Sequence, residues 1–343
     1  MTASRSHALG LTGLLLATTT WGSLFIVGKP VLRELDPLWF TLLRYTVATL
    51  GFALLLRLHG PIPWPLLRRH GPRLAALGFV GYGFFSTMVL VGLAHSVPSH
   101  GAVIMATMPI TTQLVRWGLD GIRPGIAAAA STLLAMAGVV MVSGVLQGDA
   151  STLSTGPGDL CAFVGTLGWI AYTRGAARFP ELDAVRFSSL SAIASWPLLL
   201  LGTLLFHAAG LAPHPTAHAL QAGWPSLVYI GLVPTVFGVL AYNFGVKTLG
   251  VVTSTAFLNV VPVSVLLIGA AMGSRPAAHE LAGVALVVGG LLTHTLSQRA
   301  SRAPAVVAQR PVPAGDIDRK ALVCRSPRPQ RLLSSARMRR SSS

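Results

Sequence analysis

Residues 21–45 read WGSLFIVGKPVLRELDPLWFTLLRY, and this stretch decides the fold because a related one occurs later in the chain. The second copy, residues 169–192, reads WIAYTRGAARFPELDAVRFSSLSA. Without gaps, residues 33–44 align with residues 180–191, and the identical pairs are Glu34/Glu181, Leu35/Leu182, Asp36/Asp183, Phe40/Phe187 and Leu43/Leu190. An acidic turn between two apolar segments is therefore present twice, which predicts a duplicated unit.

The composition is that of a membrane protein. Of the 343 residues, 52% are hydrophobic and 10% are charged, whereas roughly a quarter of the residues in soluble domains are charged. The runs 8–28 and 125–146 contain no charged residue, and each has about the 20 residues that a helix needs to cross a bilayer. Unbroken apolar runs exclude the alternating pattern of a membrane barrel, so we expect an all-α polytopic membrane protein.

Ten segments of the chain are apolar and long enough to span. They are residues 8–28, 37–57, 74–94, 99–119, 125–146, 158–176, 187–207, 224–245, 250–271 and 281–298. The first five form one unit (8–146) and the second five another (158–298). Because five is odd, the second unit enters the membrane upside down relative to the first. Such inverted repeats are typical of secondary transporters that alternate access between the two sides.

The placement of Lys and Arg predicts the orientation. With a cytoplasmic N-terminus, the inside connections hold Arg57, Arg68, Arg69, Arg73, Arg123, Arg178, Arg186 and Lys247. The outside connections then hold only Lys29, Arg33 and Arg275. Cytoplasmic loops carry the excess of basic residues, so we expect a multi-pass protein of the plasma (inner) membrane with both termini in the cytoplasm.

The formal charge of +16 is concentrated in the predicted tail, residues 299–343. This segment holds eleven Lys or Arg against two Asp and has no aromatic residue to stack on a base. Nucleic-acid binding is therefore not expected. The mixture of Arg, Ser and Pro predicts a disordered cytoplasmic tail, either simply solvated or touching anionic lipid. The predicted partners are the bilayer and a small-molecule substrate, with a homo-oligomer as an open option.

Several short motifs resemble one membrane-protein family. They are Trp21-Gly22-Ser23, Lys29, Asp36-Pro37, Leu43-Arg44-Tyr45, the mid-helix Pro109 and Pro262, and glycines in the fifth helix of each unit (Gly138, Gly283, Gly289 and Gly290). Together with ten helices and the repeat, this pattern resembles the EamA domain of the drug/metabolite transporter superfamily. The resemblance covers residues 8 to about 298.

The resemblance implies a ten-helix transporter of small metabolites, often amino acids or related compounds and often outward. It also implies a central cavity lined mainly by the first, third, fourth, sixth, eighth and ninth helices. Two departures bear on the substrate. Leu24 stands where the family often has Asn, and Leu119-Asp120-Gly121 and Gly273-Ser274-Arg275 stand where it tends to have Gly-Glu.

Polar and aromatic residues of the predicted spans are the candidates for substrate binding, because a polar group in lipid is costly without a partner. They are Trp21, Arg44, Thr107, Gln113, Trp169, Tyr172, Asn243 and Asn259. The alternative for these residues is helix packing. For Arg44, that alternative is an ion pair with Glu34 or Asp36 at the outer rim. Structural roles are expected for Pro109, Pro262, Asp36 and Asp183.

Enzyme chemistry has no visible basis in the sequence. His214 and His218 have helical metal-ligand spacing, but Pro213 and Pro215 argue against a helix there, so neither a metal nor a cofactor is expected. We predict a transporter of a small metabolite. The alternatives are a lipid or isoprenoid translocator on the same scaffold, and a membrane-embedded enzyme or accessory subunit.

Overall fold

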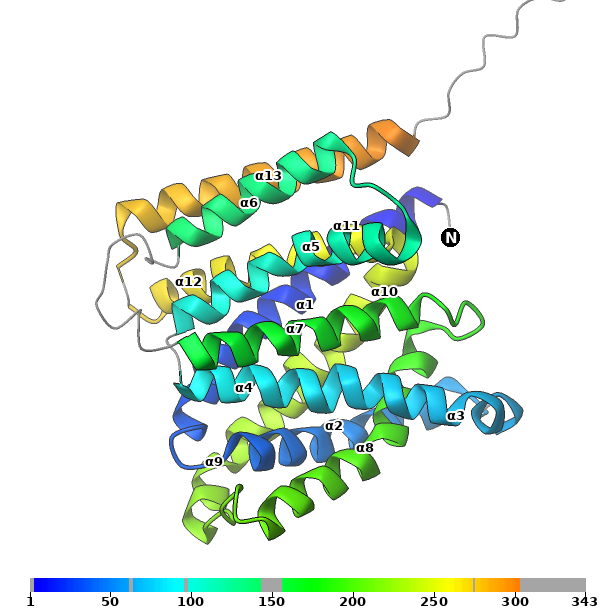
Figure 1. Cartoon of the computed structure of the whole chain (residues 1–343), viewed down its shortest axis with the longest axis vertical. Coiled ribbons are helices and arrows are strands. Elements are labelled where there is room, and N and C mark those ends of the chain that lie inside the picture. The colour runs from blue at the N-terminus through cyan, green and yellow to red at the C-terminus, as the bar shows by residue number, and fades with distance from the viewer. Residues whose placement is uncertain (1–2, 62–63, 96–97, 143–155, 274, 303–343) are drawn as a thin grey trace, which may run out of the picture. The chain divides into compact units, whose positions relative to one another are not determined.

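The computed structural model describes residues 3–61, 64–95, 98–142, 156–273 and 275–302, and within these ranges every regular element is a helix (Figure 1). The elements are α1 (Ala3–Val31), α2 (Pro37–His59), α3 (Trp64–Gly78), η1 (Phe79–Phe84), α4 (Phe85–His95), α5 (Pro98–Asp120), α6 (Ile126–Val142), α7 (Gly156–Ala176), α8 (Ala184–Ala208), α9 (Ala217–Ile230), η4 (Gly231–Phe237), α10 (Gly238–Leu249), α11 (Val251–Ala256), η5 (Phe257–Asn259), α12 (Val260–Ala271) and α13 (Ala278–Arg302).

Each of the ten predicted segments overlaps one helix or one run of helices. Among the described residues, six stretches are long and apolar enough to cross a membrane: residues 5–31, 37–59, 64–95, 184–208, 217–249 and 251–271. Two shorter apolar helices, Ile126–Met141 and Ala278–His294, fall below that length. The all-helical fold is confirmed, whereas the count of ten spanning helices stays a prediction. Most of the predicted tail, from residue 303, lies outside the described residues, and α13 continues to Arg302.

The third helical stretch of each unit is wound more loosely at one place. η1 and η4 are π-helical segments that interrupt residues 64–95 and 217–249. Pro234 lies inside η4 and has no amide hydrogen, so the carbonyl of Ile230 loses its usual helical donor. The Thr235 hydroxyl donates to that carbonyl instead, at 2.7 Å. π-helical turns occur frequently at functional sites, and both units place one at the same position.

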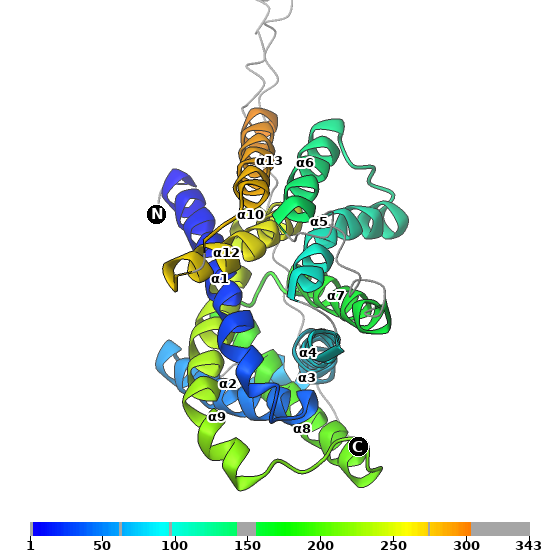
Figure 2. The same cartoon turned by 90° about the vertical axis from the view of Figure 1, so that its left-hand side faces the viewer.

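Helices of the first unit pack mainly against helices of the second. The pairs are α1 with α10, α4 with α7, α2 with α8, α5 with α7, and α6 with α13. Figure 1 shows α6 beside α13 and α4 beside α7, and Figure 2 shows α6 and α13 together at one end of the bundle. The main buried cluster accordingly draws on both units, from Leu14 and Phe52 to Phe187 and Tyr242.

The duplicated acidic turn caps the second helix of each unit. Asp36 accepts a hydrogen bond from the Leu38 amide at 2.8 Å, and Asp183 accepts one from the Arg186 amide at 2.8 Å. Each carboxylate thus satisfies an amide that has no partner within its helix. The preceding leucines, Leu35 and Leu182, are both buried. The structural role expected for the two aspartates follows from this geometry.

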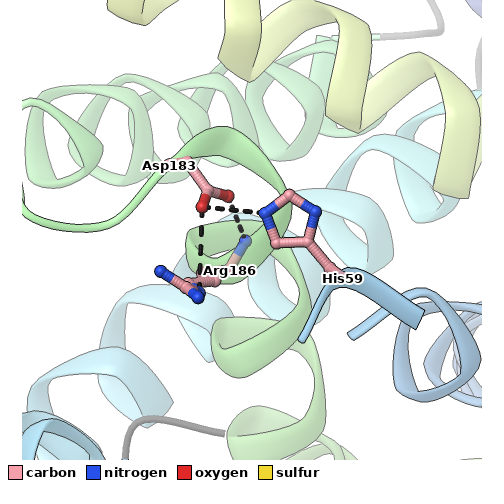
Figure 3. A network of polar contacts seen from close by, with 3 residues as sticks. All are labelled: His59, Asp183 and Arg186. Atoms are coloured by element: carbon pink, nitrogen blue, oxygen red, sulfur yellow. Dashed lines mark hydrogen bonds and ion pairs between the residues drawn. The ribbon is translucent and has the colours of Figure 1, made fainter. Parts of the chain in front are cut away.

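Asp183 also joins the two units (Figure 3). Its carboxylate lies 3.0 Å from Nε2 of His59, at the end of α2, and 3.8 Å from Nε of Arg186. Partial burial alone would raise the pKa of the Asp183 carboxyl, but hydrogen bonds from the Arg186 amide and His59 hold that pKa below its ordinary value. The carboxylate therefore stays charged at neutral pH and links α2 to the start of α8.

Adjacent glycines in α13 provide a matched test of the close contact with α6. A Cβ on Gly290 would lie 2.8 Å from the backbone of Ser131 and Ala135, whereas a Cβ on Gly289 would meet nothing within 4 Å. We expect Gly290→Ala to lower the free energy of unfolding by about 1–3 kcal/mol. The added methyl group would meet backbone atoms of α6, which cannot rotate away as a flexible side chain can. Gly289→Ala should be neutral or slightly stabilising, because Ala favours helix. Thermal unfolding of the purified protein in detergent measures both, and equal effects would contradict the packing.

Candidate functional site

A cavity lies where the two units meet. Its volume is about 60 Å³, and its wall is formed by Trp21, Leu24, Phe25, Arg44, Tyr45, Phe85, Ser86, Val89, Leu90, Met105, Trp169, Pro234, Thr235, Val239 and Leu258. These residues come from α1, α2, α4, α5, α7, η4, α10 and η5. The helices that the family resemblance implies are all represented. The structure adds α2, which contributes Arg44 and Tyr45.

Trp21 and Trp169, the residues that open the two copies of the repeat, meet at this cavity. Their ring centroids are 5.3 Å apart and the planes are perpendicular. Trp21 Nε1 donates to the carbonyl of Pro234, at 2.8 Å, inside the π-helical segment η4. Trp169 is only 2% exposed and also contacts the rings of Phe85 and Tyr242. The structure therefore brings one candidate from each unit into direct contact.

Arg44 is also at the cavity wall, and its partners differ from those predicted. Its Nη2 donates to Ser86 Oγ at 2.5 Å, and its guanidinium lies 4.6 Å from the centre of the Tyr45 ring. The predicted ion pair at the outer rim is wrong. Glu34 instead lies 3.3 Å from His218, and Asp36 caps α2. The carboxylates stay in the turn, whereas the guanidinium lies about two helical turns farther along α2.

Behind the tryptophans lies a buried polar network. The hydroxyls of Tyr82, in η1, and Tyr172, in α7, are hydrogen-bonded to each other. Asn243 Nδ2 donates to Tyr172 Oη and to Ser188 Oγ, both at 2.8 Å. The network connects the first unit to the second, and the Tyr172 ring lies 5.3 Å from Trp169. Tyr172 and Asn243 are therefore next to the cavity wall rather than part of it.

The remaining candidates are divided between the wall and the bundle. Asn259 is buried next to Leu258 of the wall, and neither atom of its amide group has a hydrogen-bond partner among the described residues. Gln113 and Thr107 do not line the cavity. Gln113 Nε2 donates to Thr132 Oγ1 at 2.9 Å and so joins α5 to α6, while Thr107 Oγ1 donates to the carbonyl of Ile104.

Pro109 and Pro262 act on the wall through the backbone. A proline cannot donate to the carbonyl four residues earlier, and those carbonyls belong to Met105 and Leu258, both of which line the cavity. Just before Pro262 the helix tightens into the 3-10 segment η5. The two units therefore interrupt regular helical hydrogen bonding at matching places in the wall, as the structural role expected for these prolines requires.

Two of the histidines near the α8–α9 connection, His207 and His214, pack against each other with ring centroids 5.6 Å apart, and both contact the ring of Trp39. Nδ1 of His207 lies 2.8 Å from the carbonyl of Ala212, and Nδ1 of His214 lies 2.9 Å from that of Pro215. His218 faces Glu34. The three imidazoles thus have different polar partners, although two of them share a ring contact.

The sequence reasoning missed four residues of this site: Tyr45, Tyr82, Ser86 and Tyr242. Aromatic spacing offered a weak signal, since Tyr45 follows Arg44 and Tyr242 precedes Asn243. Nothing in the spacing pointed to Tyr82 or Ser86, because their partners are far away in the chain.

Long apolar helices packed around an internal cavity define a multi-pass membrane protein. The profile of the EamA-like transporter family matches the chain twice, over residues 8–144 and 156–296. The chain therefore belongs to the EamA-like transporter family.

Individual proteins agree with this assignment. The chain is 26% identical over 308 residues to the uncharacterized transporter YrdR of Bacillus subtilis, covering 85% of this chain and 92% of YrdR. It is 26% identical over 282 residues to a probable terminal-alkyne amino-acid exporter of Streptantibioticus cattleyicolor, covering 81% and 91%. A crystal structure with 22% identity shares the fold, with a TM-score of 0.67 and coverage of 88% of this chain and 99% of the other.

Proposed function

We propose that this protein is a secondary transporter that exports a small, amino-acid-like metabolite across the inner membrane by alternating access. Residues 8–146 and 158–298 form its two inverted five-helix units, and both termini are cytoplasmic. One observation carries the proposal: the cavity is walled by both units, and Trp21 and Trp169 contact each other within it. A site shared by two related halves can open to either side when the halves move against each other.

The small size of the cavity supports a mechanism in which the two units move apart to admit cargo. The volume of the cavity is only about 60 Å³. That volume holds a few waters at most, so cargo enters only after the walls separate. The π-helical segment η4 and the two prolines interrupt regular helical hydrogen bonding in the wall, and η1 does so directly before α4, which contributes Phe85 to the wall. They are where the helices can bend at the smallest energetic cost.

The nature of the cargo is proposed from the cavity and from one relative. Aromatic rings and aliphatic side chains dominate the wall, and Arg44 is its sole ionisable group with a permanent charge among the described residues. A small molecule with an apolar body and few polar groups fits such a wall. The similar protein from Streptantibioticus cattleyicolor is described as an amino-acid exporter, which supports an amino-acid-like cargo.

An untargeted comparison of exported metabolites tests the proposal. Culture media from deletion and overexpression strains should differ reproducibly in at least one small metabolite, with opposite signs in the two strains. Reporter fusions at each terminus should both report the cytoplasm. Unchanged media across growth conditions would contradict export, and an external C-terminus would contradict the inverted arrangement.

A further inference from the structure

Arg44 is a buried cation without an anion beside it. The residue is 4% exposed, its Nε has no hydrogen-bond partner, and no Asp or Glu among the described residues forms an ion pair with it. A charged side chain within a membrane segment is costly, and such residues usually pair with one another or mark a substrate pathway. Arg44 has no such pair among the described residues, so packing within the protein does not offset the cost of its charge, and a role toward a ligand does.

The fold itself does not require an arginine at this position. Arg44 aligns with Ser191 in the second unit. Ser191 is fully buried, its Oγ donates to the carbonyl of Phe187 at 2.7 Å within its own helix, and it lies 3.3 Å from the Tyr82 hydroxyl. The equivalent place in a related half is therefore filled by a small neutral side chain. The guanidinium is an asymmetric feature of the cavity.

The guanidinium is held so that part of its hydrogen-bonding capacity remains unused. A guanidinium has five N–H donors in a planar fork, and a carboxylate accepts two of them side by side. Here one donor of Nη2 reaches Ser86 Oγ, which is also 3.2 Å from the Tyr45 hydroxyl. The Tyr45 ring lies against the guanidinium. These contacts fix the fork in place without neutralising its charge.

The rest of the wall is apolar and aromatic, with no Asp or Glu among the residues that form it. We propose that Arg44 is the anion anchor of the transport site, and that the cargo is a small carboxylate with an otherwise apolar body. Both an amino acid and a simple organic acid meet this description. The inference rests on the proposed transport function and adds the chemical class of its cargo.

Thermal unfolding of the purified full-length protein with four related probes tests the anchor directly. The probes are 3-phenylpropanoate, 3-phenylpropanamide, L-phenylalanine and L-phenylalaninamide. Ligands that bind the folded state raise its unfolding temperature. We expect the propanoate to raise that temperature and its amide to leave it unchanged, with an affinity difference of about tenfold or more. A larger shift with L-phenylalanine than with the propanoate assigns the cargo to amino acids, and the reverse assigns it to organic acids.

Two arginines on α2 provide the matched variants. Arg44→Gln should lose the preference for acids over amides. Arg57→Gln, which replaces an exposed arginine at the end of the same helix, should keep it. Equal shifts from acids and amides, a preserved preference in Arg44→Gln, or no shift with any probe would each overturn the anchor.

The metabolite comparison separates this inference from the proposed function. If export of an uncharged or purely cationic compound depends on the protein, transport stands and the anchor is refuted. If carboxylates bind through Arg44 but no exported metabolite changes, the anchor stands and the transport function fails.

Discussion

Arg44→Met is expected to reduce transport by about 10- to 100-fold while leaving the protein as stable as the wild type or more so. Hydrogen bonds to a charged group contribute about 1.5–3 kcal/mol, which is the interaction that a carboxylate cargo would lose. The empty protein would lose little, because Arg44 has no carboxylate partner. A buried charge without a counter-ion is a cost that a methionine of similar shape removes.

The measurement pairs cargo export with thermal unfolding of the same variant. Arg57→Met is the control, because Arg57 lies on the same helix but is exposed, and it should alter neither quantity appreciably. A fall in unfolding temperature together with a matching loss of protein from the membrane would contradict the prediction. It would mean that the guanidinium stabilises the packing through Ser86 and Tyr45.

Trp169→Ala should lower stability and transport together. The Trp169 ring lies 5.2–5.4 Å from the rings of Trp21, Phe85, Tyr172 and Tyr242, and the residue is 2% exposed. Removing a buried indole leaves a void and costs about 3–5 kcal/mol. The void would open beside the cavity and loosen the contact between the two units.

Trp169→Phe should recover most of the stability, because a phenyl ring keeps part of the contact. The control is Trp224→Ala, since Trp224 is 56% exposed on α9 and its loss should change the unfolding temperature little. Stability is read from thermal unfolding and transport from export of the identified metabolite. Normal stability in Trp169→Ala would contradict the packing described here. Normal transport would exclude Trp169 from the cargo pathway.

Much of the fold was predictable because the signals are local. Apolar runs of about 20 residues predict helices in lipid, and each of the ten predicted segments overlaps helical structure within the described residues. The repeat also predicted that Trp21 and Trp169 are equivalent, and the structure places them in contact. A proline lacks a backbone N–H wherever it stands. The expectation that Pro109 and Pro262 interrupt their helices could therefore be made without the tertiary fold.

The candidate site was predicted less completely, and the errors have a common cause. For Arg44, the alternative to substrate binding was an ion pair with a nearby acidic residue of the turn, but its partner is Ser86 on another helix. Gln113 was expected in the cavity, but it bonds Thr132 of α6. Tyr82 was not considered, yet it bonds Tyr172 across the two units. In each case the partner is set by how two helices are rotated against each other.

The sequence by itself determined the class of the molecule, its helices, its internal duplication and the residues that could be costly in lipid. Only the tertiary structure decided which of those residues share a cavity, because helices that are apolar around their whole circumference carry no stripe that marks the inward face. The packing of one unit against the other therefore chose the inward face, and it placed Arg44 in the wall without a carboxylate beside it.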